Sequence, residues 1–226
     1  MTVRLRLRRA QSSRSPKSEL ILIRHAESEM SGRYLGRTDP PLSDRGRAQA
    51  QALARRLAGE RLVALYSSPL KRALDTAQAI AAPHGLEVSR VADLAELDFG
   101  AWDGLSYGEI ERRDAERLAR WLGDPATIHP PGGETLAHMS RRVVAATQAI
   151  VAAHPHGTVA LVSHGGPIRA LVGHALGLPL EAHWRLQQDV AAITRLDWYE
   201  REAVLSLLND TCHLHETANM ISSPIG

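Results

Sequence analysis

Two histidines, two arginines and one carboxylate follow the apolar segments of this chain. Arg24 and His25 end the first apolar run, Arg72 lies a few residues beyond the second, Glu96 follows a third and His164 directly follows a later one. In an open α/β sheet the carboxyl ends of parallel strands share one edge, and ligands bind there. We therefore expect these five side chains to meet in one site that acts on a phosphate ester.

The chemistry of such an ester explains the choice of residue types. A phosphate monoester carries close to two negative charges, and its transferring group spreads charge over three oxygens, so catalysis needs fixed donors. Arg24 and Arg72 offer planar guanidinium forks, and a protonated His164 would add positive charge. His25, when neutral, can attack phosphorus and form a covalent intermediate. Glu96 is the nearest proton donor for the leaving oxygen, provided that its pKa is raised enough.

The backbone after His164 adds to this expectation. Gly165 and Gly166 allow close approach of the main chain to a ligand. A helix that starts near Pro167 would direct its positive end at the same place. Gly165 is therefore a further candidate for phosphate binding.

These groups need a scaffold that brings strand ends together. Short apolar runs alternate with helical periodicity, which indicates an α/β fold, a three-layer α/β/α sandwich whose mainly parallel central sheet is covered on both faces. Strands are expected at 20–23, 62–66, 87–91, 158–163, 191–198 and 203–208. Helices are expected from the Ser43-Asp44 cap to Gly59 and at 70–82, 134–153 and 167–176.

The domain organisation is simple. Residues 1–18 are basic and lack apolar periodicity, so a flexible leader is expected, with an organelle-targeting peptide as the alternative. Residues 19–226 are expected to form one domain, in which the less regular segment 102–130 is a helical insert over the active site. Trp102 and Tyr107 in this segment are interpreted as core or loop anchors.

Composition narrows the possible partners and location. The chain has 226 residues, a formal charge of +2 and one cysteine, Cys212, which excludes an internal disulfide framework and fits a reducing cytoplasm. No apolar run reaches the roughly 20 residues that a membrane helix needs. Arginines gather in residues 1–17 and on helical faces rather than on a dedicated nucleic-acid surface. We expect a small phosphorylated metabolite as ligand, no nucleic acid and no membrane, with a homodimer left open.

Two histidine pairs raise the question of a metal. His154 and His156 are two residues apart, as are His213 and His215, and paired histidines can bind zinc. No cysteine or carboxylate follows at a convincing spacing. We therefore expect no metal.

The motifs also resemble the histidine phosphatase superfamily, which has the phosphoglycerate mutase-like fold. They occur in the order of that family between about Leu20 and Asn209. The matching blocks are Arg24-His25-Ala26-Glu27-Ser28, Gly36-Arg37-Thr38-Asp39-Pro40-Pro41-Leu42-Ser43 with Gly46, Ser67-Ser68-Pro69 with Arg72, Glu96 with Phe99-Gly100-Ala101-Trp102-Asp103-Gly104, Pro131-Gly132-Gly133-Glu134, and Ser163-His164-Gly165-Gly166. The resemblance implies that His25 is phosphorylated, that Arg24, Arg72 and His164 bind the phosphoryl group, that Glu96 is the acid-base residue, and that no metal or cofactor is required.

Two positions differ from the pattern of that family, and two others have roles outside the phosphoryl site. Ala26 replaces the usual glycine, and Ser31 stands where many members have an asparagine that contacts the phosphate. A serine hydroxyl can still donate there. The resemblance places Arg37 at the rim of the pocket, where it could meet the leaving group, and Glu134 is interpreted first as part of a helix start.

Three functions are compatible with these residues. Hydrolysis of small phosphorylated metabolites is favoured because the segment from Gly104 to Pro131 is short, which leaves a pocket open to water. The block around Phe99 and the stretch 208–211 also resemble the phosphatase branch, which includes α-ribazole and broad-specificity phosphatases. The alternatives are a phosphoglycerate-type mutase and a non-catalytic relative that binds a phosphorylated ligand. The sequence does not specify the natural substrate.

Overall fold

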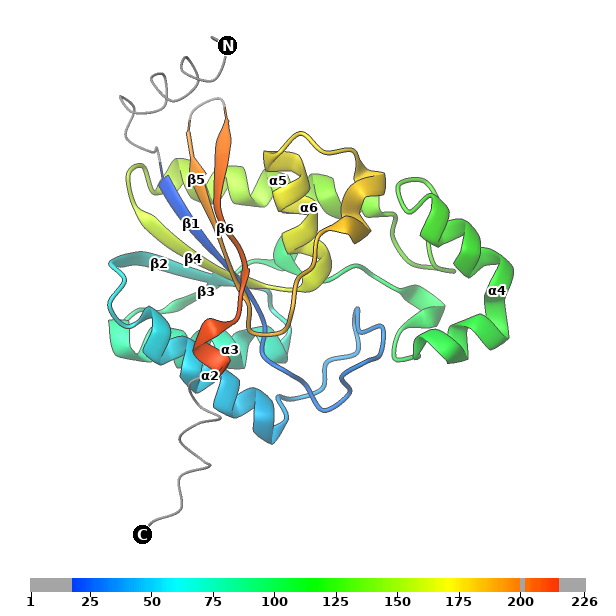
Figure 1. Cartoon of the computed structure of the whole chain (residues 1–226), viewed down its shortest axis with the longest axis horizontal. Coiled ribbons are helices and arrows are strands. Elements are labelled where there is room, and N and C mark those ends of the chain that lie inside the picture. Colours follow the sequence, from blue (N-terminus) through cyan, green and yellow to red (C-terminus); the bar gives the residue numbers. More distant parts are fainter. Residues whose placement is uncertain (1–17, 200–201, 216–226) are drawn as a thin grey trace, which may run out of the picture.

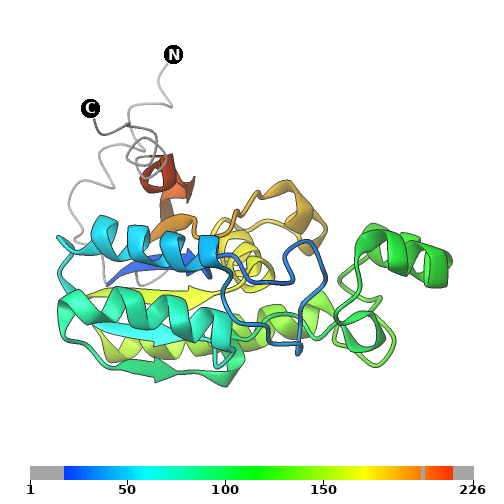
Figure 2. The ribbon, with the colours of Figure 1, turned by 90° about the horizontal axis from the view of Figure 1, so that it is seen from below.

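A six-stranded sheet lies between two layers of helices in the computed structural model, which describes residues 18–199 and 202–215 (Figures 1 and 2). The expected leader lies outside the described residues except for Ser18, which already belongs to the first strand. Within the described ranges, no helix combines the length and the apolar character needed to cross a membrane.

The sheet has the strand order β3-β2-β4-β1-β5-β6. Its strands are β1 (Ser18–Arg24), β2 (Leu62–Ser67), β3 (Val88–Arg90), β4 (Thr158–Ser163), β5 (Ile193–Trp198) and β6 (Ala203–Asp210). The first four in spatial order run parallel, whereas β5 and β6 are antiparallel to their neighbours. The predicted three-layer fold with a mainly parallel sheet is therefore confirmed.

Alternating side chains of the central strand explain why both faces are covered. Successive residues of a strand point to opposite faces, and in β1 Ile21 and Ile23 pack with one core while Leu20 and Leu22 pack with the other. The helices α2 (Asp44–Leu57) and α3 (Lys71–Ala81) cover the first face, and α5 (Leu136–Ala153) and α6 (Gly165–Ala175) cover the second (Figure 2). This double burial is the reason for the continuous apolar run before Arg24.

The helix starts follow from local hydrogen bonds. Ser43 caps α2 by accepting the N–H of Gly46, and Ser106 and Glu109 form a capping box at the start of α4 (Tyr107–Gly123). α4 is interrupted by non-helical backbone at Asp114 and lies to one side of the sheet (Figure 1). Short 3₁₀ turns connect these elements: η1 (Ala82–His84), η2 (Ala92–Leu94), η3 (Gly100–Trp102) and η4 (Leu180–Arg185). A helical turn at residues 212–215 follows β6.

One boundary matters for the site. The sequence predicts a helix from Pro167, but α6 begins two residues earlier, at Gly165. Proline is tolerated here because the N–H groups of a helix's first turn have no partner within the helix. As a result, the first N–H groups of α6 come from two glycines directly after His164.

Candidate active site

The candidate site lies where β1, β2 and β4 end side by side. Arg24, at the end of β1, is paired in register with Ser163, at the end of β4. The adjacency continues beyond the strands, because the N–H of His25 donates to the carbonyl of Ser163 at 2.9 Å and the N–H of Ser68 donates to that of Val162 at 2.9 Å. Segments far apart in sequence are thereby held at one edge of the sheet.

His25 is oriented by its own backbone neighbourhood. The side chain is buried, with 6% exposed, and its Nδ1 lies 2.7 Å from the carbonyl oxygen of Ala26. A carbonyl can only accept a hydrogen bond, so Nδ1 carries the proton and Nε2 keeps a free lone pair. Burial, followed by the charges of Arg24 and Arg72, holds the pKa of His25 well below its ordinary value. A neutral ring with this lone pair has what a nucleophile needs.

His164 lies beside His25 and occupies the N-cap position of α6, without a capping hydrogen bond from its side chain. The two ring centroids are 5.0 Å apart, and Nε2 of His164 lies 2.7 Å from Oγ of Ser68. Its Nδ1 has no hydrogen-bond partner among the described residues. Burial, and next the charge of Arg72, holds the pKa of His164 well below its ordinary value. Burial therefore opposes the protonated His164 that the sequence suggests, and the positive charge of the site comes first from its arginines.

Two guanidinium groups keep donors free for a ligand. Arg24 donates from Nη1 to the carbonyl of Gln188 at 2.5 Å, and Arg72 donates from its Nη atoms to the carbonyls of Thr38 and Leu35 at 3.0 and 2.7 Å. In both arginines Nε is buried with no protein acceptor among the described residues. Unpaired buried donors are costly, and phosphoryl oxygens would satisfy them.

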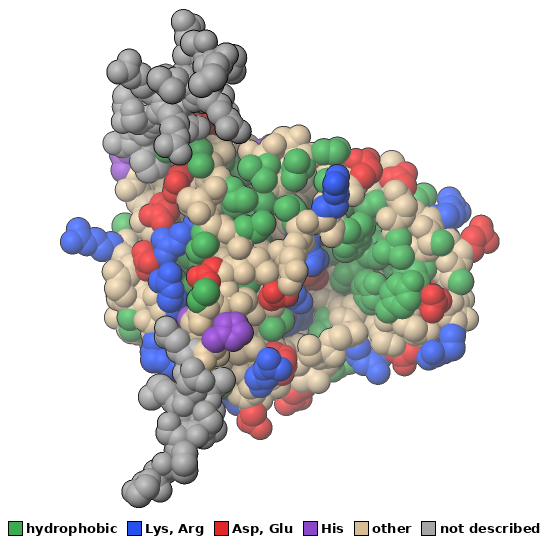
Figure 3. Space-filling view, in the orientation of Figure 1, with side chains coloured by type: hydrophobic (Ala, Val, Ile, Leu, Met, Phe, Trp, Pro, Cys, Tyr) green, Lys and Arg blue, Asp and Glu red, His purple; other side chains and the backbone are tan. Residues whose placement is uncertain are grey.

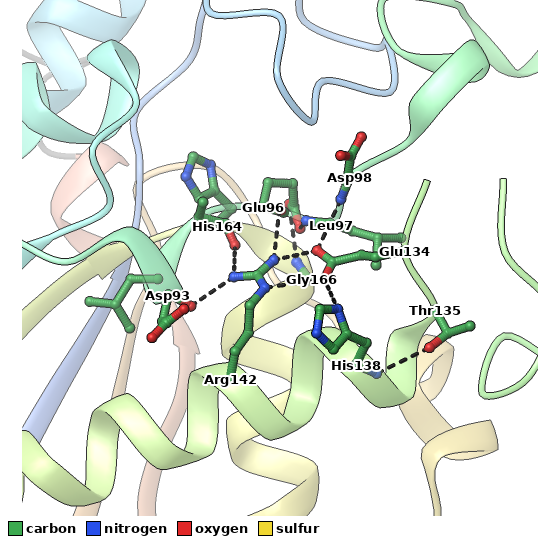
Figure 4. Close-up of polar contacts among 12 residues, drawn as sticks. Asp93, Glu96, Leu97, Asp98, Glu134, Thr135, His138, Arg142, His164 and Gly166 are labelled. Carbon is green, nitrogen blue, oxygen red and sulfur yellow. Dashed lines mark hydrogen bonds and ion pairs between the residues drawn. The ribbon is translucent and has the colours of Figure 1, made fainter. Parts of the chain in front are cut away.

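Glu96 is held by two backbone N–H groups from different segments. Oε1 accepts from Leu97 at 2.8 Å, and Oε2 accepts from Gly166 at 3.2 Å. The second bond docks the loop after η2 onto the first turn of α6 (Figure 4). The carboxylate lies in the same pocket as His25.

An arginine on α5 holds the loop that carries Glu96. Arg142 donates to the carbonyls of Asp93, Ala95 and Glu96 at 2.7, 2.8 and 2.9 Å and pairs with the carboxylate of Glu134 (Figure 4). Glu134 also accepts the N–H of Asp98. The helix start expected at Glu134 is instead capped by Thr135. Sequence reasoning missed Arg142, although its spacing of two helical turns from Glu134 was a usable signal.

The pocket has a volume of about 180 Å³, with a polar floor and a largely apolar wall. Arg24, His25, Arg72 and Glu96 line the floor, and Gly165 lies beside them. The wall includes Tyr34, Phe99, Trp121, Pro125, Leu136, Met139 and Trp184. Apolar side chains also gather on the surface at the side that carries α4 (Figure 3). The leaving group of a substrate would contact this wall.

Of the two other predicted binding residues, one lines the pocket and one does not. Ser31 is exposed and lines the pocket. Arg37 does not line it: its side chain is 78% exposed and donates to Asp98 at 2.8 Å. Sequence reasoning also missed the pocket residues Trp121, Arg169, His183 and Trp184. Two of them had a signal: Arg169 lies one helical turn after Gly165, and Trp121 belongs to the segment predicted to lie over the active site.

The described residues contain no cluster of three or more His, Cys, Asp or Glu side chains arranged to hold a metal ion. His154, from one of the two histidine pairs, is hydrogen-bonded instead, with Nε2 2.8 Å from the hydroxyl of Tyr66.

A mainly parallel sheet with two histidines and an arginine at its carboxyl edge, and a second arginine at the start of the helix after β2, is typical of enzymes that act on phosphate esters. Comparison with known families identifies which one. Residues 20–211 match the family model of the histidine phosphatase superfamily (branch 1), and the chain belongs to this family.

Three relatives illustrate its neighbourhood. Phosphoserine phosphatase 1 of Hydrogenobacter thermophilus is 41% identical over 200 residues, which cover 88% of this chain and 95% of that protein. The adenosylcobalamin/alpha-ribazole phosphatase of Escherichia coli is 31% identical, with 84% of this chain and 95% of that protein covered. The structure of a phosphoserine phosphatase from Entamoeba histolytica in complex with 3-phosphoglyceric acid superposes with a TM-score of 0.79 at 30% identity, covering 87% of this chain and 99% of that one.

Proposed function

We propose that the protein hydrolyses small phosphate monoesters through a phosphohistidine on His25. The observation that carries the proposal is the hydrogen bond from Nδ1 of His25 to Ala26, which leaves Nε2 unprotonated. The charges of Arg24 and Arg72 act on this ring. A nucleophile and fixed cations for the transferring oxygens therefore share one pocket.

The reaction divides into two balanced steps. Nε2 of His25 forms a bond to phosphorus while the ester P–O bond breaks, and Glu96 gives a proton to the leaving oxygen. Water then attacks the phosphohistidine, Glu96 takes its proton, and the P–N bond breaks to release phosphate. Arg24 and Arg72 hold the phosphoryl oxygens in both steps, with His164 beside them and the N-terminal N–H groups of α6 adding positive potential.

The sequence predicts one domain with an insert over the active site, and two residues of that insert line the pocket. We propose that residues 19–226 act as one catalytic domain and that segment 102–130 covers the pocket. Trp121 and Pro125 of this segment line it, in support of that role. A cytoplasmic location and a homodimer stay predictions.

An assay with several substrates tests the proposed function. The purified protein is incubated with p-nitrophenyl phosphate, O-phosphoserine, α-ribazole phosphate and 3-phosphoglycerate, with and without 2,3-bisphosphoglycerate and with EDTA. Phosphate release that survives EDTA and is lost in His25→Ala supports hydrolysis. Interconversion of phosphoglycerates that depends on the bisphosphate would establish a mutase instead, and ligand binding without turnover would establish capture. O-phosphoserine is included because the 41% identical relative is named for it.

A further inference from the structure

One cation in the pocket is not used by the phosphoryl chemistry. Arg169, on α6, lines the pocket and donates from Nε to the carbonyl of Leu186 at 2.7 Å. It forms no ion pair within the part of the chain that the structure describes. Its Nη atoms are therefore free to bind a ligand.

Arg169 lies next to the phosphoryl site. A Cβ built on Gly165 would lie 3.5 Å from Nη1 of Arg169 and 3.6 Å from Nε and Cζ of Arg24, so the two guanidinium groups flank this glycine. The proximity follows from the helix, because residues four apart share one face. A ligand held by Arg24 is thus within reach of Arg169.

No carboxylate among the described residues is hydrogen-bonded to Arg169, although the charges of Glu96 and Asp189 act on it from a distance. The buried Nε donors of Arg24 and Arg72 are left for the phosphoryl group, and Nη1 of Arg72 also lies 3.4 Å from the carboxylate of Asp39. The pocket's own carboxylate, Glu96, is bonded to backbone N–H groups, and the carboxylate of Asp189 accepts hydrogen bonds from Gln187 and Asn209. One guanidinium fork therefore remains for an anionic group of the ligand, and a carboxylate matches its geometry.

A neutral histidine completes this end of the pocket. His183 is 5% exposed, lines the pocket, and has no partner for Nδ1 among the described residues. Burial, and next the charge of Arg169, lowers the pKa of His183 to about 3. The ring can exchange a hydrogen bond with a polar group beside the carboxylate without adding charge.

We propose that Arg169 determines specificity by binding a carboxylate on the leaving group. The preferred substrates are then phosphate monoesters of small hydroxy acids, with or without an amino group. This proposal rests on the proposed function and adds the chemical class of the substrate to it.

Matched substrate pairs test the role of Arg169. O-phosphoserine and phosphoethanolamine differ by one carboxylate, and 3-phosphoglycerate and glycerol 3-phosphate differ by a carboxylate in place of a hydroxymethyl group. Wild type should prefer the carboxylate member of each pair. In Arg169→Gln, kcat/KM for the carboxylate members should fall roughly 100-fold because a charge-assisted contact is lost, whereas the other members change less than about 3-fold.

The control variant is Arg185→Gln. Arg185 is exposed at the end of η4 and does not line the pocket, so its loss removes the same charge nearby and should change neither member of a pair. Equal losses on both members in Arg169→Gln would show that Arg169 holds the phosphoryl group or only anchors Leu186, and would overturn the proposal. Wild type that hydrolyses both members equally would overturn it as well and leave the proposed function standing. Wild type that hydrolyses none of them, nor p-nitrophenyl phosphate, would overturn both.

Discussion

The side chain of Glu96 occupies the space that a side chain on Gly166 would need. Oε2 accepts the N–H of Gly166 at 3.2 Å, and a Cβ built on that glycine would lie 2.3 Å from Oε1. The contact involves the flexible end of Glu96 rather than backbone. A methyl group at this position would therefore displace the carboxylate without unfolding the helix.

Gly166→Ala should separate the position of Glu96 from the stability of the fold. We expect kcat for 3-phosphoglycerate or phosphoserine to fall at least about 10-fold, with little change in the thermal midpoint. Gly173→Ala is the matched control, because it lies on the same helix with nothing within 4 Å of the added Cβ. Full activity of Gly166→Ala would show that this contact does not place the proton donor.

Glu96→Gln should depend on the leaving group. An amide cannot protonate the leaving oxygen, so esters of ordinary alcohols should be hydrolysed about 100-fold more slowly or worse. p-Nitrophenyl phosphate should be affected far less, because its leaving group needs little protonation. Steady-state kinetics on both substrates check this, and equal losses would point to another donor, with Asp98 the next to test.

Arg142→Gln should act through the loop that carries Glu96. Loss of the guanidinium frees three backbone carbonyls and removes the arginine partner of Glu134, which is largely buried. We expect kcat on poor leaving groups to fall while KM changes little, together with a lower thermal midpoint. Arg141→Gln, at the adjacent exposed position, is the control. A variant that lost stability but kept the leaving-group dependence of wild type would show that Arg142 supports the fold only.

His183 should make stability depend on pH. Its pKa is lowered to about 3 in the folded protein, against 6.5 for the ordinary group. The unfolded chain therefore takes up a proton first as the pH falls, so that stability is full above pH 6.5 and is lost toward pH 3. Between pH 6.5 and 5.0 the contribution is about 2 kcal/mol. Urea unfolding at pH 6.5 and pH 5.0 gives the drop in the free energy of unfolding between these pH values. This drop should be smaller by about 2 kcal/mol in His183→Gln than in wild type. It should be unchanged in His174→Gln, which removes an exposed histidine. An unchanged loss in His183→Gln would contradict a neutral, buried His183.

The ends of the central strands could be predicted from the sequence. A strand that is buried on both faces of the sheet has a continuous run of apolar residues, and the run stops where the strand ends. The runs that end at Arg24 and Ser163 are the two neighbouring strands β1 and β4, and the polar residues after them lie together as expected. Local hydrogen-bonding chemistry also placed the start of α2 at Ser43. These features depend on nearest neighbours in sequence.

The rest of the site depends on contacts that no local pattern encodes. The lowered pKa of His164 follows from its burial beside Arg72, and Arg37 is directed to Asp98 rather than into the pocket. His183 and Trp184 reach the pocket from η4, which has no chemical motif of its own. Such residues become visible only when the turns and loops are placed in three dimensions.

The strand order determines how much of the chain must be synthesised before the candidate site can form. β1 leads directly into His25, the proposed nucleophile, and is synthesised before the other strands of the sheet. Its parallel neighbour β4 is made much later, after α5, and its other neighbour, β5, later still. Sheets built from such distant pairings form slowly. Until the ribosome has added β4 and the first turn of α6, His25 has neither His164 nor the N–H groups of that turn beside it. The candidate site can therefore assemble only after this part of the chain has been made.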